Sequence, residues 1–151
     1  AKQSNVLAVG GSWMVKPELI EAENWDAISA LCSEAVVTLQ GLEFAHLGIN
    51  NENAAEAEKT IAALEAFGMV KKVGNSSTFL NTTIEVLPKM YYGRLGHLGF
   101  KCFDIERPLA YLGRHGFTVN EETITRDAKG KIKVCYIQQE FSGFAVHLIK
   151  A

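Results

Sequence analysis

The sequence predicts an α+β fold in which two βαβββ modules pair into one curved sheet. The main observation is a tetrapeptide pattern, His-Leu-Gly and an apolar residue, at residues 46–49 and again at 97–100, each time heading an apolar strand. Each copy is followed by a helix-like segment that ends in glycine and then by strand-like runs. One such module leaves a sheet face uncovered, so pairing of the two modules is the expected solution.

Composition limits the partners and the compartment. The net charge is −2, and the 15 basic and 17 acidic residues are interspersed, which leaves no basic surface for nucleic acid or an anionic membrane. There is no signal-like N-terminus and no apolar run of roughly 18 residues. Cys32, Cys102 and Cys135 lie far apart among apolar neighbours, as buried thiols in a reducing compartment do. We expect a cytoplasmic protein with a small-molecule substrate, and the sequence also allows a homodimer.

Residues 1–40 are predicted to form a short appendage of strand, turn and helix. The apolar run at residues 5–9 predicts a buried strand, and a glycine pair follows it as a turn. Pro17 marks a helix start. Apolar residues at helical spacing over 25–39 predict a second helix, which Gly41 ends.

Residues 41–151 are predicted to form the paired domain, with modules 41–93 and 94–151. The first module is expected to contain strand, helix and three strands at residues 43–50, 54–67, 69–73, 77–80 and 81–87. Asn51 or Asn53 can cap its helix. The second module repeats this order at residues 94–103, 105–115, 117–126, 131–139 and 144–150, with Gly130 in the turn of a hairpin.

Four side chains with metal-binding chemistry occupy matching places in the two modules. His46 and His97 lie on the first strands, and Glu85 and His147 lie on the last strands. An ionised Glu85 inside an apolar strand is costly unless it is paired or coordinated. Three imidazoles and one carboxylate suit one divalent ion of Zn, Ni, Co, Fe or Mn, with further positions open to water or substrate oxygens. The alternative is that these residues only line a polar pocket.

Other polar residues give weaker signals. Strand alternation places Lys101 and Thr83 on the ligand-bearing faces of their strands, so both are candidate substrate-binding residues, although Lys101 is equally typical of a solvated surface. Tyr136 is a weaker candidate. Glu85 is the only carboxylate of the four and hence the first candidate for a catalytic base. His115 is predicted to be structural, because it lies in the last turn of a helix and has no counterpart in the first module.

From residue 41 to the end, the chain resembles the vicinal oxygen chelate superfamily, which includes glyoxalase I, bleomycin- and fosfomycin-resistance proteins, extradiol dioxygenases and methylmalonyl-CoA epimerase. The resemblance is carried by His46, Gly68, Glu85, His97, Gly116 and the ending Gly143-Phe144-Ala145-Val146-His147-Leu148. It implies a curved sheet around one divalent metal that chelates two neighbouring substrate oxygens and stabilises an enediolate or related anion. Glyoxalase I carries Glu at the last ligand position, and His147 here alters the site charge and removes that carboxylate.

Residues 1–39 resemble another family. The segment Ala8-Val9-Gly10-Gly11-Ser12-Trp13-Met14-Val15, followed by Trp25-Asp26-Ala27-Ile28, is similar to the last strand, phosphate-binding turn and final helix of 2-keto-3-deoxygluconate-6-phosphate and 4-hydroxy-2-oxoglutarate aldolases. That family is a (β/α)₈ barrel with a Schiff-base lysine on an earlier strand, which has no counterpart here. The resemblance implies the end of a longer aldolase-like polypeptide with a chelate-type domain appended.

Together these observations predict a metal-dependent lyase or isomerase that acts on a small oxygenated substrate. The aldolase-like segment suggests a 2-oxo acid or a sugar-acid derivative. The alternative, from a different class of protein, is a regulatory module that binds a metabolite for the aldolase portion without chemistry.

Overall fold

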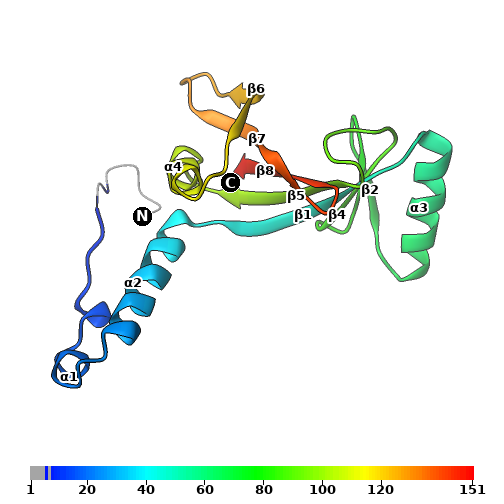
Figure 1. The fold of residues 1–151 in the computed structure, drawn as a ribbon. Coiled ribbons are helices and arrows are strands. Elements are labelled where there is room, and N and C mark those ends of the chain that lie inside the picture. The colour runs from blue at the N-terminus through cyan, green and yellow to red at the C-terminus, as the bar shows by residue number, and fades with distance from the viewer. Residues whose placement is uncertain (1–5, 7) are drawn as a thin grey trace. The chain divides into compact units, whose positions relative to one another are not determined.

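The computed structural model describes residue 6 and residues 8–151 (Figure 1). The chain forms two compact units, residues 1–42 and residues 43–151. The first unit is helical in its described part, and the second contains the sheet. None of the helices in the described residues is long and apolar enough to cross a membrane.

The first unit contains η1 (Ser12–Met14), α1 (Pro17–Glu21) and α2 (Trp25–Gln40). As predicted, Pro17 is the first residue of α1, and Gly41, with a left-handed φ of 62°, ends α2. The strand predicted over residues 5–9 lies partly outside the described residues, and its described residues 6, 8 and 9 are not in a strand. A strand needs a neighbour to satisfy its backbone groups, and the described part of this unit contains no other strand.

The first module of the second unit comprises β1 (Glu43–Asn50), α3 (Ala54–Ala66), β2 (Lys71–Val73), β3 (Thr78–Leu80) and β4 (Ile84–Leu87). The order is as predicted, and β1 has the predicted bounds. Asn53 rather than Asn51 caps α3, because its side-chain oxygen accepts a hydrogen bond from the backbone N–H of Glu56 at 3.0 Å. Residues 81–83 form a turn instead of extending β4, since Asn81 has a φ of 53°.

The second module comprises β5 (Gly96–Cys102), α4 (Glu106–Arg114), β6 (Val119–Arg126), β7 (Ile132–Phe141) and β8 (Phe144–Lys150). It has the element order of the first module, and its closing strand has the predicted bounds. Gly130, with a φ of 77°, lies in the turn between β6 and β7, as predicted. The outer strands β6 and β7 have 8 and 10 residues, against 3 residues in each of β2 and β3.

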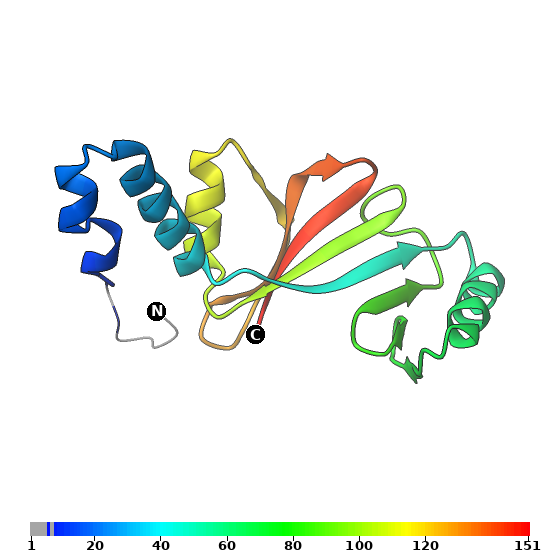
Figure 2. The same ribbon diagram turned by 90° about the horizontal axis from the view of Figure 1, so that it is seen from below.

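All eight strands form one mixed sheet in the order β2-β3-β4-β1-β5-β8-β7-β6 (Figure 2). The modules join through the antiparallel pair β1 and β5. Within each module, the first strand pairs in parallel with the last strand. The predicted α+β fold of paired modules is therefore confirmed, and the central strands β4, β1, β5 and β8 are those to which the sequence assigns the ligands.

Buried apolar side chains in both modules hold these strands in place. In the first module, Ala57 and Ile61 of α3 pack with Leu80 of β3 and Val86 of β4, all of them buried. In the second module, the buried apolar residues include Cys102, Ile105, Ile132, Cys135, Ile137 and Leu148. The three cysteines are free. Cys102 and Cys135 are buried, as predicted, whereas Cys32 is half-buried. Removing this apolar surface from water is the main term that stabilises the sheet.

Candidate metal centre

The strand register places the four predicted ligands on one face of the sheet. Two rows of directly paired residues cross the central strands, Glu85–Gly48–His97 and His46–Gly99–His147. Residues paired across neighbouring strands point to the same face, and so do residues two apart on one strand. Each row therefore holds two ligands with a glycine between them, and the rows are adjacent.

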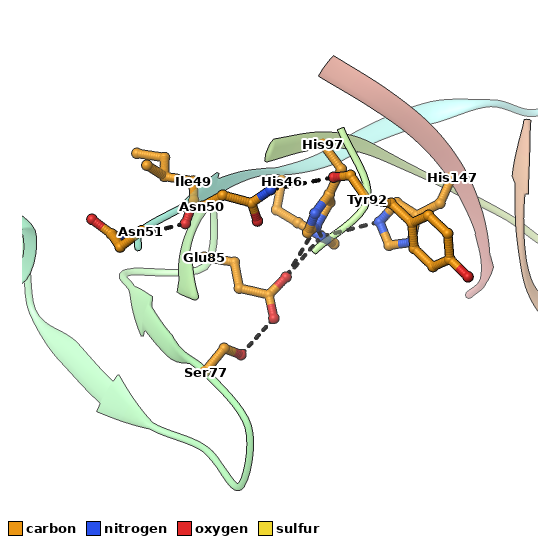
Figure 3. A network of polar contacts seen from close by, with 9 residues as sticks. All are labelled: His46, Ile49, Asn50, Asn51, Ser77, Glu85, Tyr92, His97 and His147. Atoms are coloured by element: carbon orange, nitrogen blue, oxygen red, sulfur yellow. Dashed lines mark hydrogen bonds and ion pairs between the residues drawn. The ribbon is translucent and has the colours of Figure 1, made fainter. Parts of the chain in front are cut away.

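The four side chains meet at their tips, as Figure 3 shows. The Nε2 atom of His46 lies 3.1 Å from Nε2 of His97 and 3.2 Å from Nε2 of His147. The Oε2 atom of Glu85 lies 3.1 Å from Nε2 of His97 and 3.3 Å from Nε2 of His46. The three imidazoles are buried, and their ligand atoms all lie within 4.8 Å of one another.

This arrangement has more close contacts than hydrogen bonding can use. Nε2 of His46 has three polar neighbours within 3.3 Å, yet an imidazole nitrogen carries either one hydrogen or one lone pair. Ligand atoms about 2.0 to 2.1 Å from a shared ion would be separated by about 2.9 Å in octahedral and about 3.3 Å in tetrahedral geometry. The observed separations span this range. The donor set therefore fits one divalent transition-metal ion held by His46, Glu85, His97 and His147.

Glycine makes room for the imidazoles. A Cβ atom on Gly48 would lie 2.1 to 2.4 Å from three atoms of the His97 ring. A Cβ atom on Gly99 would lie 2.6 Å from both Nε2 of His147 and Cε1 of His46. The rings thus occupy space that any other residue would fill. This explains why each histidine of the repeated tetrapeptide is followed two positions later by glycine.

Glu85 is held by a residue outside the predicted set. The Ser77 hydroxyl donates a hydrogen bond to Oε1 at 2.5 Å, while Oε2 faces His46 and His97. Burial alone would raise the pKa of the Glu85 carboxyl. Hydrogen bonds from His46, His97 and Ser77 outweigh burial and lower the pKa well below its ordinary value of 4.5. Glu85 is therefore an ionised acceptor at neutral pH, which suits a metal ligand.

The imidazoles of His97 and His147 are oriented by packing rather than by hydrogen bonds to their other ring nitrogens. The Nδ1 atoms of His97 and His147 are buried without a partner in the described residues, whereas ligating histidines usually donate this N–H to an acceptor. Burial, and then the neighbouring His97 and His46, lower the pKa of His147 to about 3. His147 is therefore neutral at physiological pH, the form that can donate its lone pair to a metal.

Aromatic side chains flank the four ligands on both sides. Phe79 of β3 pairs with Glu85, and its ring centroid is 5.5 Å from that of His46. Tyr136 of β7 pairs with His147, and the two ring centroids are 4.8 Å apart.

The remaining predicted residues lie apart from the cluster. Lys101 is four residues beyond His97 along β5, a span of about 13 Å, and its Nζ lies 3.4 Å from Oε2 of Glu43. Thr83 is exposed in the turn before β4, where its carbonyl accepts a hydrogen bond from the backbone N–H of Leu47. His115 caps α4, with its Nδ1 2.9 Å from the carbonyl oxygen of Tyr111. Neither Lys101 nor Thr83 contacts the four ligands in any interaction of the described residues.

Sequence reasoning missed two features of this site. Ser77 has no local signal, because its contact with Glu85 depends on the pairing of β3 with β4. Gly48 and Gly99 did carry a signal, the shared offset of two residues from His46 and His97. The spacing placed each glycine on the face of its histidine, but their steric role emerges only from the cross-strand pairing.

The fold is the one that the resemblance to the vicinal oxygen chelate superfamily implied, two paired βαβββ modules in one curved sheet, with a three-histidine cluster at its centre. No model of a protein family matches the chain, and none of the curated proteins matches it. A solved structure of a hypothetical protein from Bacillus halodurans C-125 is similar, with a TM-score of 0.51 and 12% identity, over 73% of this chain and 94% of that chain. This likeness shows the fold.

Methylmalonyl-CoA epimerases are also among the similar solved structures. The enzyme from Streptomyces coelicolor, in complex with 2-nitronate-propionyl-CoA, has a TM-score of 0.47 and 13% identity, over 72% of this chain and 94% of that chain. The enzyme from Mycobacterium tuberculosis has a TM-score of 0.46 and 15% identity, over 71% of this chain and 86% of that chain.

Proposed function

We propose that residues 43–151 form a metal-dependent lyase or isomerase of the vicinal oxygen chelate superfamily that acts on a small oxygenated substrate. The observation that carries the proposal is the meeting of three Nε2 atoms and one carboxylate oxygen at separations of 3.1 to 3.3 Å. The four donors come from four different strands, so their meeting depends on the pairing of β4, β1, β5 and β8. A polar pocket without an ion would not bring so many acceptors onto one nitrogen.

The residues define what the site can do. His46, Glu85, His97 and His147 would hold one divalent ion, which as a Lewis acid polarises neighbouring substrate oxygens and stabilises developing negative charge. One carboxylate and three neutral imidazoles leave a bound divalent ion with a residual positive charge. The site would therefore favour an anionic or easily ionised oxygen ligand over a neutral one.

Glu85 is the first candidate for the proton acceptor in this proposal. It is the only carboxylate among the four donors, and its side chain retains 16% exposure, against 2% for that of His97. Its Oε1 atom is turned away from the imidazoles toward Ser77. A carboxylate with one oxygen outside the donor cluster can take a proton from a ligand without removing an imidazole.

The aldolase-like resemblance of the first 39 residues stays a prediction, and with it the choice of a 2-oxo acid as substrate. The same holds for the substrate-binding roles of Lys101 and Thr83, for the cytoplasmic location and for a homodimer. A 2-oxo acid would suit the site, because its carboxylate and carbonyl place two oxygens side by side.

The test begins with elemental analysis of the purified full chain, followed by removal of metal with a chelator and titration with Co²⁺. We expect about one equivalent of transition metal and the visible absorption bands of Co²⁺ in a nitrogen and oxygen site. Activity would then be sought as solvent deuterium incorporated next to the carbonyl of small 2-oxo acids, followed by NMR. A protein that takes up no metal contradicts the proposal. Metal and ligand binding without exchange or turnover would favour the regulatory module.

A further inference from the structure

Tyr136 lies against the candidate metal centre but belongs to none of the roles assigned so far. It pairs with His147 across β7 and β8, so both side chains point to the ligand-bearing face. Its ring is tilted by 30° against that of His147, and its centroid is 6.1 Å from that of His97. The residue is only 6% exposed.

The Tyr136 hydroxyl is the unusual part of this residue. No hydrogen bond within the described residues uses it. The fully buried side-chain atoms without a partner are Gln40 Oε1, Asn50 Oδ1, His97 Nδ1 and His147 Nδ1. The Tyr136 hydroxyl is not among them, so its oxygen keeps some exposed surface although the residue as a whole is buried. A buried tyrosine usually finds a partner for its hydroxyl, and none of the described residues supplies one here, which leaves the hydroxyl available to a water or a ligand.

The surroundings hold Tyr136 in place. Its backbone N–H donates a hydrogen bond to the buried Thr123 hydroxyl at 2.8 Å, where the pairing of β6 and β7 is irregular. Its ring packs on that of Tyr92, with centroids 4.6 Å apart. The Tyr92 segment is in turn fixed by Asn50, whose side-chain amide donates a hydrogen bond to the carbonyl of Gly93 at 2.7 Å. A donor held in this way is preorganised for a ligand.

The first module provides an internal reference. Phe79 pairs with Glu85 as Tyr136 pairs with His147, and it too packs on a ligand imidazole. Phe79 has no hydroxyl. At this matched pair of positions the two flanks differ in one chemical group, the Tyr136 hydroxyl, which can donate a hydrogen bond to an oxygen of a ligand.

We propose that Tyr136 is a substrate-binding residue whose hydroxyl donates a hydrogen bond to one oxygen of a small ligand with two neighbouring oxygens, held beside His147. This inference rests on the proposed function, because it takes the ligand to sit at the four-donor centre. It adds a specificity element from the second module. Ligands with an acceptor oxygen on this flank are favoured over those that present a carbon there.

The test uses the full chain loaded with Co²⁺ and acetohydroxamate as the probe, a small ligand with two neighbouring oxygens. Tyr136→Phe removes only the hydroxyl and keeps the ring packing. We expect Co²⁺ to bind the variant as tightly as the parent, and acetohydroxamate, followed by the change in the Co²⁺ absorption bands, to bind about tenfold more weakly. Tyr111→Phe, on α4 beside His115, is the matched control and should bind the probe like the parent.

The outcomes separate the two proposals. Equal affinity of acetohydroxamate for the parent and Tyr136→Phe, with Co²⁺ bound to both, overturns the role of Tyr136 and leaves the metal site standing. Failure of the parent to bind Co²⁺ overturns both. A Tyr136→Phe variant that also loses Co²⁺ affinity shows that the hydroxyl supports the ligand imidazoles, which likewise contradicts a substrate-binding role.

Discussion

The two modules have the same element order but supply the site in different ways. The first contributes His46 and the charged Glu85, whose carboxylate has Ser77 as a hydrogen-bond partner. The second contributes His97 and His147, two buried imidazoles whose Nδ1 atoms have no partner in the described residues. The first module thus orients its distinctive ligand by a hydrogen bond, and the second orients its ligands by packing.

The modules differ again at the edges of the sheet. The outer strands β2 and β3 are short, and α3 packs on β3 and β4 through its own apolar cluster. The outer strands β6 and β7 are long and carry Tyr136 beside the site. The site requires the four central strands, whereas the outer strands differ between the two modules. Substitutions that affect one module more than the other test this view.

The largest expected effect is that of His97→Ala. Nε2 of His97 contacts both His46 and Glu85, and no other side chain in the described residues can replace this neutral donor. We expect metal affinity to fall by more than about 100-fold, beyond the range typical of outer partners of metal ligands. Calorimetric titration with Zn²⁺ or Co²⁺ measures this. His115→Ala is the control, and equal loss in both variants would show that the cluster is not the metal site.

The next largest effects are expected for the two glycines. Gly99 of the second module leaves room for His46 of the first, and Gly48 of the first leaves room for His97 of the second. Gly99→Ala places a Cβ 2.6 Å from atoms of His46 and His147, one ligand from each module, and Gly48→Ala crowds only His97. We expect metal affinity to fall about 10- to 100-fold in both, as for misplaced ligands. Neither glycine has a positive φ, so the change acts on the rings rather than on the backbone.

Gly113→Ala provides the matched control for the glycine variants. Gly113 lies inside α4 with open space around the position of a Cβ. Its substitution should leave metal affinity unchanged and stabilise the helix by about 1 kcal/mol. If Gly99→Ala binds metal as well as Gly113→Ala does, the steric account of the repeated tetrapeptide is wrong.

The central strands and the ligands can be predicted from the sequence because both are encoded locally. Apolar residues bounded by turn residues give β1 and β8 their bounds, and the repeated tetrapeptide identifies His46 and His97. The ends of β2 to β4 cannot be predicted this way. They depend on which residues pair and on the left-handed conformation of Asn81. Of the strand predicted near the N-terminus, the described residues 6, 8 and 9 are not in a strand, and the rest lies outside the described residues.

The partners of the ligands could not be predicted for a related reason. Ser77 reaches Glu85 only through the pairing of β3 with β4, and Tyr136 reaches His147 only through that of β7 with β8. Register is a property of the assembled sheet. Alternation alone also cannot fix where a long side chain ends, because the Nζ atom of Lys101 lies beside Glu43, and the substrate-binding role of Lys101 stays a prediction.

Glu85→Gln tests the carboxylate ligand, which the first module supplies and the second does not. The substitution keeps the size and one oxygen donor but removes the charge and the ability to accept a proton. If Glu85 is the base, the variant keeps most of its metal and loses about 10² to 10⁴ in turnover. If Glu85 is only a ligand, metal content and turnover fall together. Ser77→Ala, which leaves the carboxylate in place, should weaken metal binding less than Glu85→Gln does.

Acidification should lower the free energy of unfolding through one ligand of each module, His147 and Glu85. The pKa of His147 is about 3 in the folded protein and 6.5 when unfolded, so between these values only the unfolded chain binds the proton. The lowered pKa of Glu85 likewise stabilises the fold above about 4.5, and this contribution is lost as the pH falls. The metal-free protein should lose on the order of a few kcal/mol between pH 7 and pH 4, measured by urea unfolding. A flat profile would show that His147 is not buried as a neutral imidazole.

The smallest expected effect comes from outside the two modules. Residues 1–42 form a compact unit of their own, and every ligand lies in the unit of residues 43–151. Deleting residues 1–42 should therefore leave metal affinity within about twofold of the parent, because the deletion removes none of the four ligands. Solubility is the property that this deletion can change, since Trp13, Trp25 and Val37 of the first unit are exposed. A loss of metal affinity on deletion would mean that residues 1–42 support the sheet that carries the ligands.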